Sequence, residues 1–266
     1  MSGAGTAAER WARELAAWRI PDEILSRAPE SPWAFPPALF GAEGARDGAL
    51  HELARAALEG GGRVLDVGCG GGAASVPLAP PATELVGVDS SPEMLAAFAR
   101  AAGAAGVTHR EVLGDWPGVA GKVVGDAGRL EVVVCRNVVY NVADVAGFLT
   151  ALTASASRRV VVELTETHPS APLAPLWMHF WGLSRPDGPT AGLFLEVIDG
   201  LGYRPQVVRR SRPAVKSGTD LDDHVAFVRR RLCLDRSRDP EVRAALAGAG
   251  LSERDSVATV VVAWDP

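Results

Sequence analysis

Short apolar runs alternate with amphipathic and glycine-rich stretches over most of the chain. Most of these runs are rich in valine and leucine, which is typical of strands buried on both faces of a parallel sheet. We expect strands within residues 63–72, 84–89, 108–117, 131–136, 159–164, 203–212 and 259–264. Between the fourth and fifth runs, apolar residues share one helical face, namely Val145, Phe148, Leu149 and Leu152. Alternating strands and helices predict an α/β fold.

The first 59 residues carry a different pattern. Trp11, Leu15 and Trp18 recur at helical spacing, and prolines then surround Trp33. The segment 30–40 is too apolar to stay in water and too rich in proline to form one helix. We therefore expect residues 1–50 to form an N-terminal helical cap. The sequence does not specify whether this cap covers the mouth of a ligand site or the back of the sheet.

Two insertions interrupt the domain that we expect over residues 51–266. The first, 165–190, contains five prolines around an aromatic cluster at 176–181. It begins at the carboxyl end of a strand, and ligands bind at that edge in open α/β sheets. The aromatic cluster is therefore a candidate substrate pocket or lid, although core packing would also explain it. The second insertion, 213–250, is expected to be helical.

Composition supports one large domain with helical additions. The chain has 266 residues, of which 47% are hydrophobic, enough to build a substantial core. No apolar run approaches the roughly 20 residues that cross a bilayer, and the first residues lack the pattern of a signal peptide. We therefore expect a soluble, cytoplasmic protein. Three cysteines without a C-x-x-C pair indicate neither a disulfide framework nor a zinc site.

Charge is uneven along the chain. The formal net charge of −5 offers no general cationic field for nucleic acid. Residues 203–236 are an exception, with nine basic and four acidic side chains. Such a patch can contact phosphate, although arginine-rich helices also form ordinary solvated faces. Nucleic acid is not the expected partner, but RNA binding stays an alternative.

The stretch 63–72, R-V-L-D-V-G-C-G-G-G, is the most informative part of the sequence. Its glycines tolerate positive φ, so the backbone can turn tightly and approach a ligand closely. The N–H groups of the loop and of a following helix N-terminus would then face that ligand. Gly68, Gly70 and Ala73 also satisfy the dinucleotide fingerprint G-x-G-x-x-G/A, so the glycines alone do not name the cofactor.

Asp66 discriminates between the possible cofactors. A carboxylate two residues before the first glycine would place negative charge close to a pyrophosphate, which Coulomb repulsion disfavours. S-adenosyl-L-methionine (SAM) carries an ammonium, a sulfonium and no phosphate, so Asp66 could accept hydrogen bonds from its amino-acid end. A second acid, Asp89, ends the next strand 21 residues after Gly68, where nucleoside-binding α/β folds hold ribose hydroxyls. NAD sites share this second feature.

These motifs resemble those of class I SAM-dependent methyltransferases, whose first motif, V-L-D-x-G-C-G-x-G, fits residues 64–72. The resemblance covers about residues 50–266. It implies a doubly wound, seven-stranded, mostly parallel sheet in which the last strand is antiparallel beside the fifth. It also implies SAM as the cofactor and S-adenosyl-L-homocysteine as the product.

The resemblance also implies a set of cofactor-binding residues. Asp89 would bind both ribose hydroxyls, and Asp115 would accept from the exocyclic amine of adenine with Trp116 beside the purine. Met94 would lie against the adenine, unless it is simply part of the core. The full set is Asp66, Gly68, Cys69, Gly70, Asp89, Ser90, Met94, Asp115, Trp116 and Arg136. The loop after the fourth strand departs from the family, which often carries histidines where Arg136, Asn137 and Asn141 stand.

The mechanism implied is in-line displacement at the methyl carbon. Holding the reactants in line can supply about 7 to 11 kcal/mol, so an amine or phenolate acceptor needs no general base, whereas an alcohol does. We regard His179 and Tyr140 as the candidate catalytic residues, His179 because of its ordinary pKa and its aromatic setting. A histidine beside tryptophans is also commonly structural. No metal is expected, because the spacing of His168, His179 and Glu166 matches no standard motif.

We therefore expect a SAM-dependent methyltransferase that acts on a small, apolar or aromatic acceptor, because the cap and the first insertion are aromatic while the protein is acidic overall. The alternatives are an RNA methyltransferase that uses the 203–236 patch, an NAD-dependent oxidoreductase, and a SAM-binding regulator without catalysis. The oligomeric state stays open, with a homodimer as one option.

Overall fold

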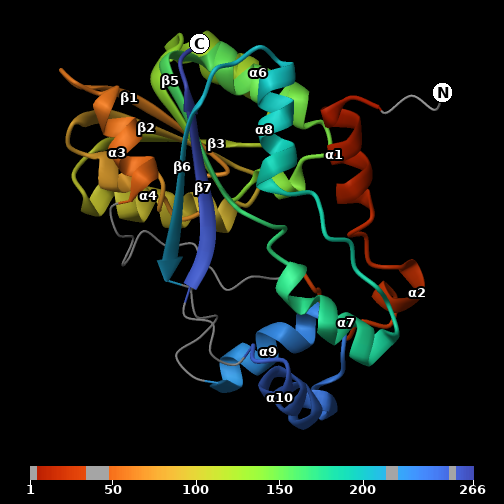
Figure 1. Cartoon of the computed structure of the whole chain (residues 1–266). Coiled ribbons are helices and arrows are strands. Elements are labelled where there is room, and N and C mark those ends of the chain that lie inside the picture. The colour runs from red at the N-terminus through yellow and green to blue at the C-terminus, as the bar shows by residue number, and fades with distance from the viewer. Residues whose placement is uncertain (1–4, 34–47, 214–220, 252–255) are drawn as a thin grey trace.

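A seven-stranded sheet forms the centre of the computed structural model (Figure 1), which describes residues 5–33, 48–213, 221–251 and 256–266. The strand order is β3-β2-β1-β4-β5-β7-β6. The strands are β1 (Gly62–Val67), β2 (Ala82–Asp89), β3 (Thr108–Leu113), β4 (Leu130–Arg136), β5 (Ala156–Thr165), β6 (Gln206–Pro213) and β7 (Ser256–Trp264). Only β7 runs against its neighbours β5 and β6. The expectation of a mostly parallel sheet with an antiparallel last strand is confirmed.

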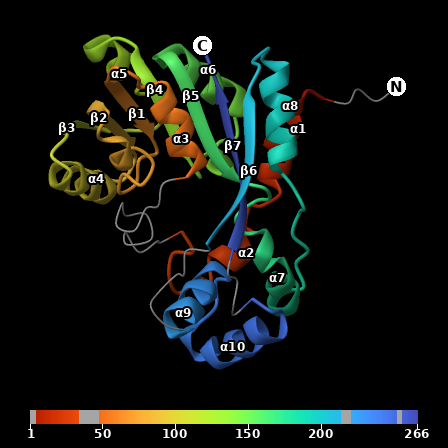
Figure 2. The same ribbon diagram turned by 60° about the vertical axis from the view of Figure 1, so that its left-hand side comes forward.

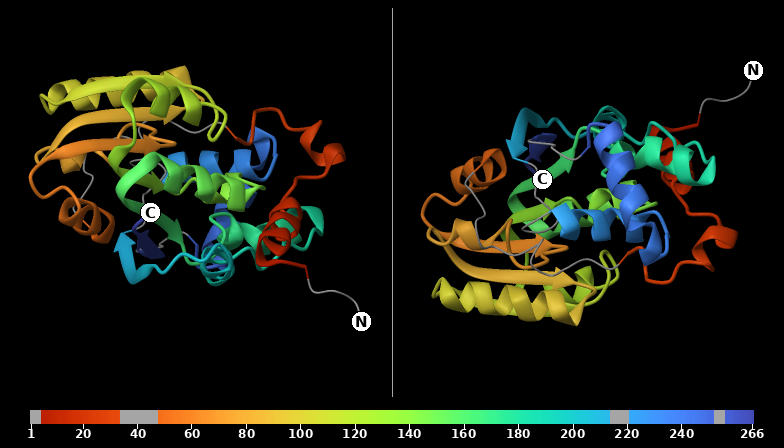
Figure 3. Two further views of the ribbon diagram at one scale, coloured as in Figure 1. Left: turned by 90° about the horizontal axis from the view of Figure 1, so that it is seen from above. Right: turned by 90° about the horizontal axis from the view of Figure 1, so that it is seen from below.

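Two apolar cores cover the two faces of this sheet, because the strands alternate their side chains between faces. Leu65 and Val67 of β1 join one core, beneath α1 (Ala7–Ala16), α5 (Ala120–Ala127), α6 (Val145–Ser155) and α8 (Ala191–Gly200). Val64 joins the other, beneath α3 (Ala49–Ala56) and α4 (Pro92–Ala104). The views from above and below in Figure 3 show helices on both sides of the sheet. The fold is therefore doubly wound, as expected.

A separate helical lobe lies beyond the carboxyl ends of the parallel strands. It consists of α2 (Asp22–Leu25), α7 (Ala174–Trp181), α9 (Leu221–Arg231) and α10 (Asp239–Gly248). Figures 1 and 2 place these helices together below the sheet, on the side to which the arrowhead of β6 points. The lobe has a third core of its own, which includes Ile24, Trp177, Val228, Leu232 and Leu246.

The two helices of the N-terminal segment pack in different places. Helix α1 packs on the sheet face beside α8, whereas α2 joins the lobe. The described part of residues 1–50 therefore packs partly on a sheet face and partly in the lobe. Part of the apolar segment 30–40 and part of the insertion 213–250 lie outside the described residues, which omit 34–47 and 214–220.

The segment after the glycine loop corrects one expectation. The sequence predicts that the loop leads into a helix, but the chain continues as turns and the short 3-10 helix η2 (Val76–Leu78). Pro77, Pro80 and Pro81 stand in this segment. Proline lacks the N–H that an α-helix needs and clashes with the preceding turn, so the predicted α-helix is wrong.

Candidate nucleoside site at the carboxyl edge of the sheet

The loop after β1 requires glycine for two reasons. Gly68, Gly70 and Gly72 have φ values of 69°, 50° and 88°, a region that residues with a Cβ rarely adopt. A Cβ on Gly68 would also lie 2.4 Å from Cγ2 of Val138, which follows β4. The loop therefore runs directly against the end of the neighbouring strand.

Asp66 lies fully buried under this loop, with an exposed fraction of 0%. Its Oδ2 accepts a hydrogen bond of 2.6 Å from Ser75 Oγ, while Oδ1 has no hydrogen-bond partner among the described residues. Burial raises the pKa of Asp66 to about 7, against the opposing effects of the Ser75 hydrogen bond and of Arg136. A cationic ligand at Oδ1 would favour the ionised form.

Asp89 connects the end of β2 to the glycine loop. Its Oδ2 accepts from the Gly70 N–H at 2.9 Å, and its Oδ1 accepts from the Ser91 N–H at 3.0 Å. Ser91 in turn caps α4, accepting from the Met94 N–H at 3.2 Å, with Pro92 in the first turn. Each carboxylate oxygen keeps a further lone pair, so Asp89 can still accept from two ligand hydroxyls.

The turn after β3 lies next to Asp89. The Gly114 N–H donates to the Asp89 carbonyl at 3.0 Å, which brings Asp115 and Trp116 to the same edge. The Trp116 ring packs against the core on one sheet face, and its Nε1 is buried without a hydrogen-bond acceptor among the described residues. Predicted residues from the ends of β1, β2 and β3 are thus neighbours in space.

The end of β4 carries a pair of charges and a strained residue. Arg136 Nε donates to Glu163 Oε1 of β5 at 3.0 Å. The next residue, Asn137, has a φ of 59°, and its buried Oδ1 has no partner in the described part of the chain. Sequence analysis did not select Asn137. Asparagine tolerates this backbone region better than most residues, but many surface turns share that property.

His51 is a second residue that sequence analysis missed. It is buried on α3, where its Nδ1 accepts from the Gly48 N–H at 3.2 Å and its Nε2 lies 3.1 Å from the Ala73 carbonyl of the loop. Helix α3 therefore contacts the end of the glycine loop through His51. No local motif marks His51, because its partner is 22 residues away in sequence.

A column of rings connects the sheet edge with the lobe. Trp11 stacks on Tyr140 at 5.4 Å between centroids, Tyr140 meets His168 edge-on at 5.3 Å, and His168 stacks on Trp18 at 4.1 Å. Arg185 continues the column, with its Cζ 5.0 Å from the centroids of both Trp18 and Trp177. Residues after β4 and β5 are thereby joined to the N-terminal segment and to α7.

The two candidate catalytic residues have different positions. Tyr140 lies in the column, where its hydroxyl donates to the Thr165 carbonyl at 2.7 Å and burial raises its pKa above the ordinary value. His179 lies on α7 with 56% of its side chain exposed, 3.8 Å from Glu241 of α10. Its ring also meets Phe180 within the lobe. The structure therefore brings Tyr140, but not His179, next to the ends of β4 and β5.

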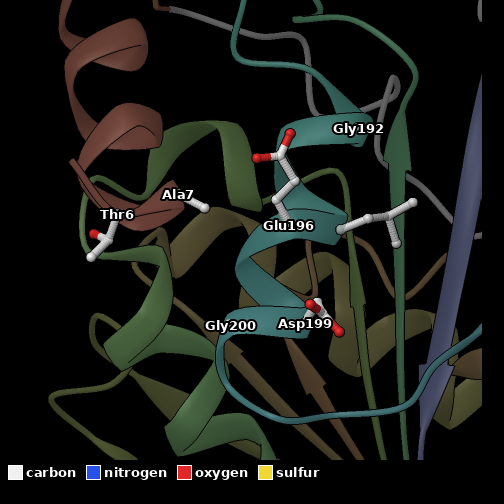
Figure 4. Close-up of a pocket in the computed structure, with 7 residues that line it drawn as sticks. Thr6, Ala7, Gly192, Glu196, Asp199 and Gly200 are labelled. Atoms are coloured by element: carbon white, nitrogen blue, oxygen red, sulfur yellow. The ribbon is translucent and has the colours of Figure 1, made fainter. Parts of the chain in front are cut away.

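A surface hollow between α1 and α8 is separate from this edge (Figure 4). It is lined by Thr6, Ala7, Gly192, Leu195, Glu196, Asp199 and Gly200. None of these residues belongs to a loop at the carboxyl ends of β1 to β5.

Across residues 5–33, 48–213, 221–251 and 256–266, no three His, Cys, Asp or Glu side chains are grouped as metal ligands would be. Among the described helices, none is long and apolar enough to span a membrane.

Comparisons with known proteins add independent information. A family model described as a methyltransferase domain matches residues 42–197. The ubiquinone biosynthesis O-methyltransferase of Azorhizobium caulinodans is 41% identical over 88 residues, which are 33% of this chain and 33% of that protein. The enzyme of the same name from Cereibacter sphaeroides is 36% identical over 90 residues, 34% of each chain. The chain thus matches about a third of the length of these curated relatives.

Solved structures share the fold. A SAM-dependent methyltransferase from Geobacter sulfurreducens, in complex with S-adenosyl-L-homocysteine, has a TM-score of 0.52 at 21% identity, covering 93% of this chain and 98% of that one. A protein studied for the conversion of a disulfide bond into a thioacetal group during echinomycin biosynthesis has a TM-score of 0.55 at 19% identity, with 91% of each chain covered. At these identities the likeness establishes the fold alone.

Proposed function

Because this chain belongs to the methyltransferase domain family, we propose that it transfers a methyl group from SAM to a small aromatic molecule. The family match confirms the resemblance seen in the motifs. The observation that carries the proposal is a pair of buried acceptor atoms at the ends of β1 and β4, Asp66 Oδ1 and Asn137 Oδ1, which lie beside a glycine loop and have no hydrogen-bond partner among the described residues.

These acceptors fit the cofactor chemically. A buried carbonyl or carboxylate oxygen without a donor costs free energy. The amino-acid end of SAM carries an ammonium group, which supplies several N–H donors and a positive charge. A pyrophosphate would instead bring further acceptors and negative charge to Asp66, so the oxidoreductase alternative is not favoured.

We propose the following roles for the residues at this edge. Asp66 and Asn137 would receive the ammonium group, and Asp89 would accept from the ribose hydroxyls. Asp115 would accept from the adenine amine. Trp116, Met94, Cys69 and Ser90 would line the nucleoside, the glycine loop would pass along it, and Arg136 would face the carboxylate. When bound, SAM would supply a methyl group activated for in-line displacement.

The acceptor would lie between the ends of β4 and β5 and the helical lobe. Tyr140, His168 and Trp18 form a mainly buried aromatic cluster there, and such surroundings would favour a planar acceptor. The relatives named O-methyltransferases support an oxygen atom as the methyl acceptor. Tyr140 would contact the acceptor through its ring and would not act as a base. Its hydroxyl already donates to a backbone carbonyl, and its raised pKa keeps it protonated. His179 has no part in this proposal.

The arginine-rich alternative loses most of its support. Arg229 is 4% exposed and pairs with Glu30 and Asp239 at 2.9 and 2.8 Å. Arg209 lies 3.6 Å from Glu166. Arg229 and Arg209 are thus paired within the protein, so neither adds an unpaired charge to the cationic face that phosphate binding needs.

Calorimetric titration with SAM, S-adenosyl-L-homocysteine and NADH tests the proposal. We expect both adenosyl ligands to bind and NADH not to bind, and Asp89→Asn to weaken adenosyl binding by at least about tenfold, because an amide cannot accept through its nitrogen. Asp199→Asn on α8 is the matched control, since Asp199 is exposed and pairs only with Arg204 among the described residues. Binding of NADH alone would contradict the proposal.

A further inference from the structure

We propose that Arg185 and His168 form a subsite for a carboxylate group on the methyl acceptor. The inference rests on the proposed function and narrows its substrate to aromatic acids. It starts from a cation that the described part of the protein leaves without a counter-charge.

Arg185 is half-buried between two tryptophans. Its Nη atoms donate to the carbonyls of Trp18 and Arg19, and its Cζ lies 5.0 Å from the ring centroids of Trp18 and Trp177. No carboxylate of the described residues pairs with it, and its Nε is buried without an acceptor there. Burial lowers the pKa of Arg185 from its usual range. A partly desolvated charge without a counter-charge is costly, so an anion from outside the chain would stabilise it.

His168 contacts Trp18, as Arg185 does, and offers a neutral donor. The Ser170 N–H donates to its Nδ1 at 3.2 Å, so the neutral ring carries its proton on Nε2. Burial, followed by the positive charges of Arg185 and Arg231, lowers the pKa of His168 to about 4. At neutral pH the ring is therefore uncharged and donates through Nε2, and its lowered pKa makes it a weak proton acceptor.

Arg231 is a second positive charge that acts on His168. It ends α9, and its Cζ lies 5.4 Å from the Phe227 ring and 5.8 Å from the Trp33 ring. Burial and the neighbouring Arg230 lower its pKa to about 10, so it stays charged at neutral pH. Two cations from distant segments thus act on the same histidine.

The aromatic rings around Arg185 and His168 indicate what kind of molecule would carry the carboxylate. Trp18 stacks on His168 at 4.1 Å and also carries Arg185 on its ring. The group lies after β5, beside Tyr140 after β4, at the edge where the acceptor would meet the cofactor. Aromatic faces favour a planar ring, and guanidinium with an imidazole N–H favours a carboxylate. The acceptor class is therefore a small aromatic acid.

A purely structural role for Arg185 makes a different prediction. The same side chain ties residues 18 and 19 to the lobe through its carbonyl bonds. If that were its whole role, replacing it would weaken binding of charged and neutral aromatic molecules to the same extent.

The test is calorimetric binding to protein saturated with S-adenosyl-L-homocysteine. The probes are benzoate, 4-hydroxybenzoate, 3,4-dihydroxybenzoate and indole-3-acetate, each with its uncharged primary amide. We expect at least one acid to bind about tenfold or more tightly than its amide. Arg185→Gln should remove this preference while leaving S-adenosyl-L-homocysteine affinity unchanged, and Arg185→Lys should retain part of it. Arg204→Gln, at an exposed ion pair with Asp199, is the matched control and should behave as wild type.

Three results would overturn the inference: acids and amides that bind wild type equally, no acid that binds, or an Arg185→Gln variant that keeps the preference. The wild-type comparison alone decides the first two, even if the variant unfolds. Failure of S-adenosyl-L-homocysteine itself to bind would instead overturn the proposed function, and this inference with it.

Discussion

Asp66 makes the unliganded protein sensitive to pH. Burial raises its pKa from 3.8 to about 7, so the folded state holds this proton more tightly than the unfolded chain. The free energy of unfolding should therefore fall as pH rises from about 4 to about 7, by a few kcal/mol at roughly 1.4 kcal/mol per pKa unit. Asp66→Asn should lack this contribution, because its amide stays neutral.

Thermal unfolding of both proteins without ligand, at pH 5 and pH 8, measures the effect. The melting temperature of wild type relative to Asp66→Asn should drop between the two pH values, and other titrating groups cancel in the difference. Equal changes of melting temperature in the two proteins would show that ionisation of Asp66 does not lower the stability of the folded state. SAM should restore wild-type stability at pH 8, because an ammonium group favours the carboxylate.

Single residues also show what the sequence could reveal of the site. The position of Asp66 before the glycines is enough to predict a cofactor with a positive charge, and the structure puts Asp66, Asp89 and Asp115 at one edge of the sheet. Asn137 and His51 were not predictable, because an unpaired buried oxygen and a contact to the Ala73 carbonyl depend on segments far away in sequence. His179 was selected for its chemistry and aromatic neighbours, yet its side chain is largely exposed.

The glycine loop is the element on which the cofactor site depends most directly. Gly68→Ala would place a Cβ 2.4 Å from Val138 Cγ2 at a φ of 69°. Gly106 has the same φ of 69° but nothing within 4 Å of its Cβ position. Gly106→Ala should therefore cost only the backbone strain of about 1 kcal/mol, whereas Gly68→Ala adds a steric clash.

Urea unfolding and titration with S-adenosyl-L-homocysteine separate the two effects. We expect Gly68→Ala to lose about 1 to 3 kcal/mol more stability than Gly106→Ala and to bind the ligand at least about tenfold more weakly, because the loop must move away from β4. Gly106→Ala should bind as wild type. Equal losses in the two variants would indicate that backbone conformation alone requires glycine at residue 68.

The order of strands and helices was more predictable from the sequence than the structure of the segments that connect them. Valine-rich runs identify strands because burial on both faces leaves few polar positions, and α6 follows from its apolar face. The α-helix expected after the glycine loop is absent, because prolines at 77, 80 and 81 interrupt the segment in which such loops usually continue as a helix. Local backbone chemistry decided that segment.

At the scale of the whole molecule, three segments that are separate in sequence meet in the lobe. The cap and the two insertions were each expected to be helical or aromatic, but nothing in their periodicity indicates that α2, α7, α9 and α10 would share one core. An amphipathic face specifies that a helix is covered, not by which partner. The ring column from Trp11 to Trp177 then joins this lobe to the sheet.

A separate core should allow the lobe to unfold locally while the sheet stays intact. Leu232 is fully buried in the lobe, and Leu85 is fully buried in a core of the sheet. Each Leu→Ala change should cost about 2 to 5 kcal/mol within its own core. Hydrogen exchange should therefore increase in α7, α9 and α10 of Leu232→Ala but not in β1, β2 or β4, and S-adenosyl-L-homocysteine should still bind. Leu85→Ala should raise exchange in the strands and weaken that binding.

Faster exchange throughout the sheet of Leu232→Ala would contradict this prediction. It would show that the ring column makes lobe and sheet one cooperative unit. The acceptor site could then not open without loosening the cofactor site.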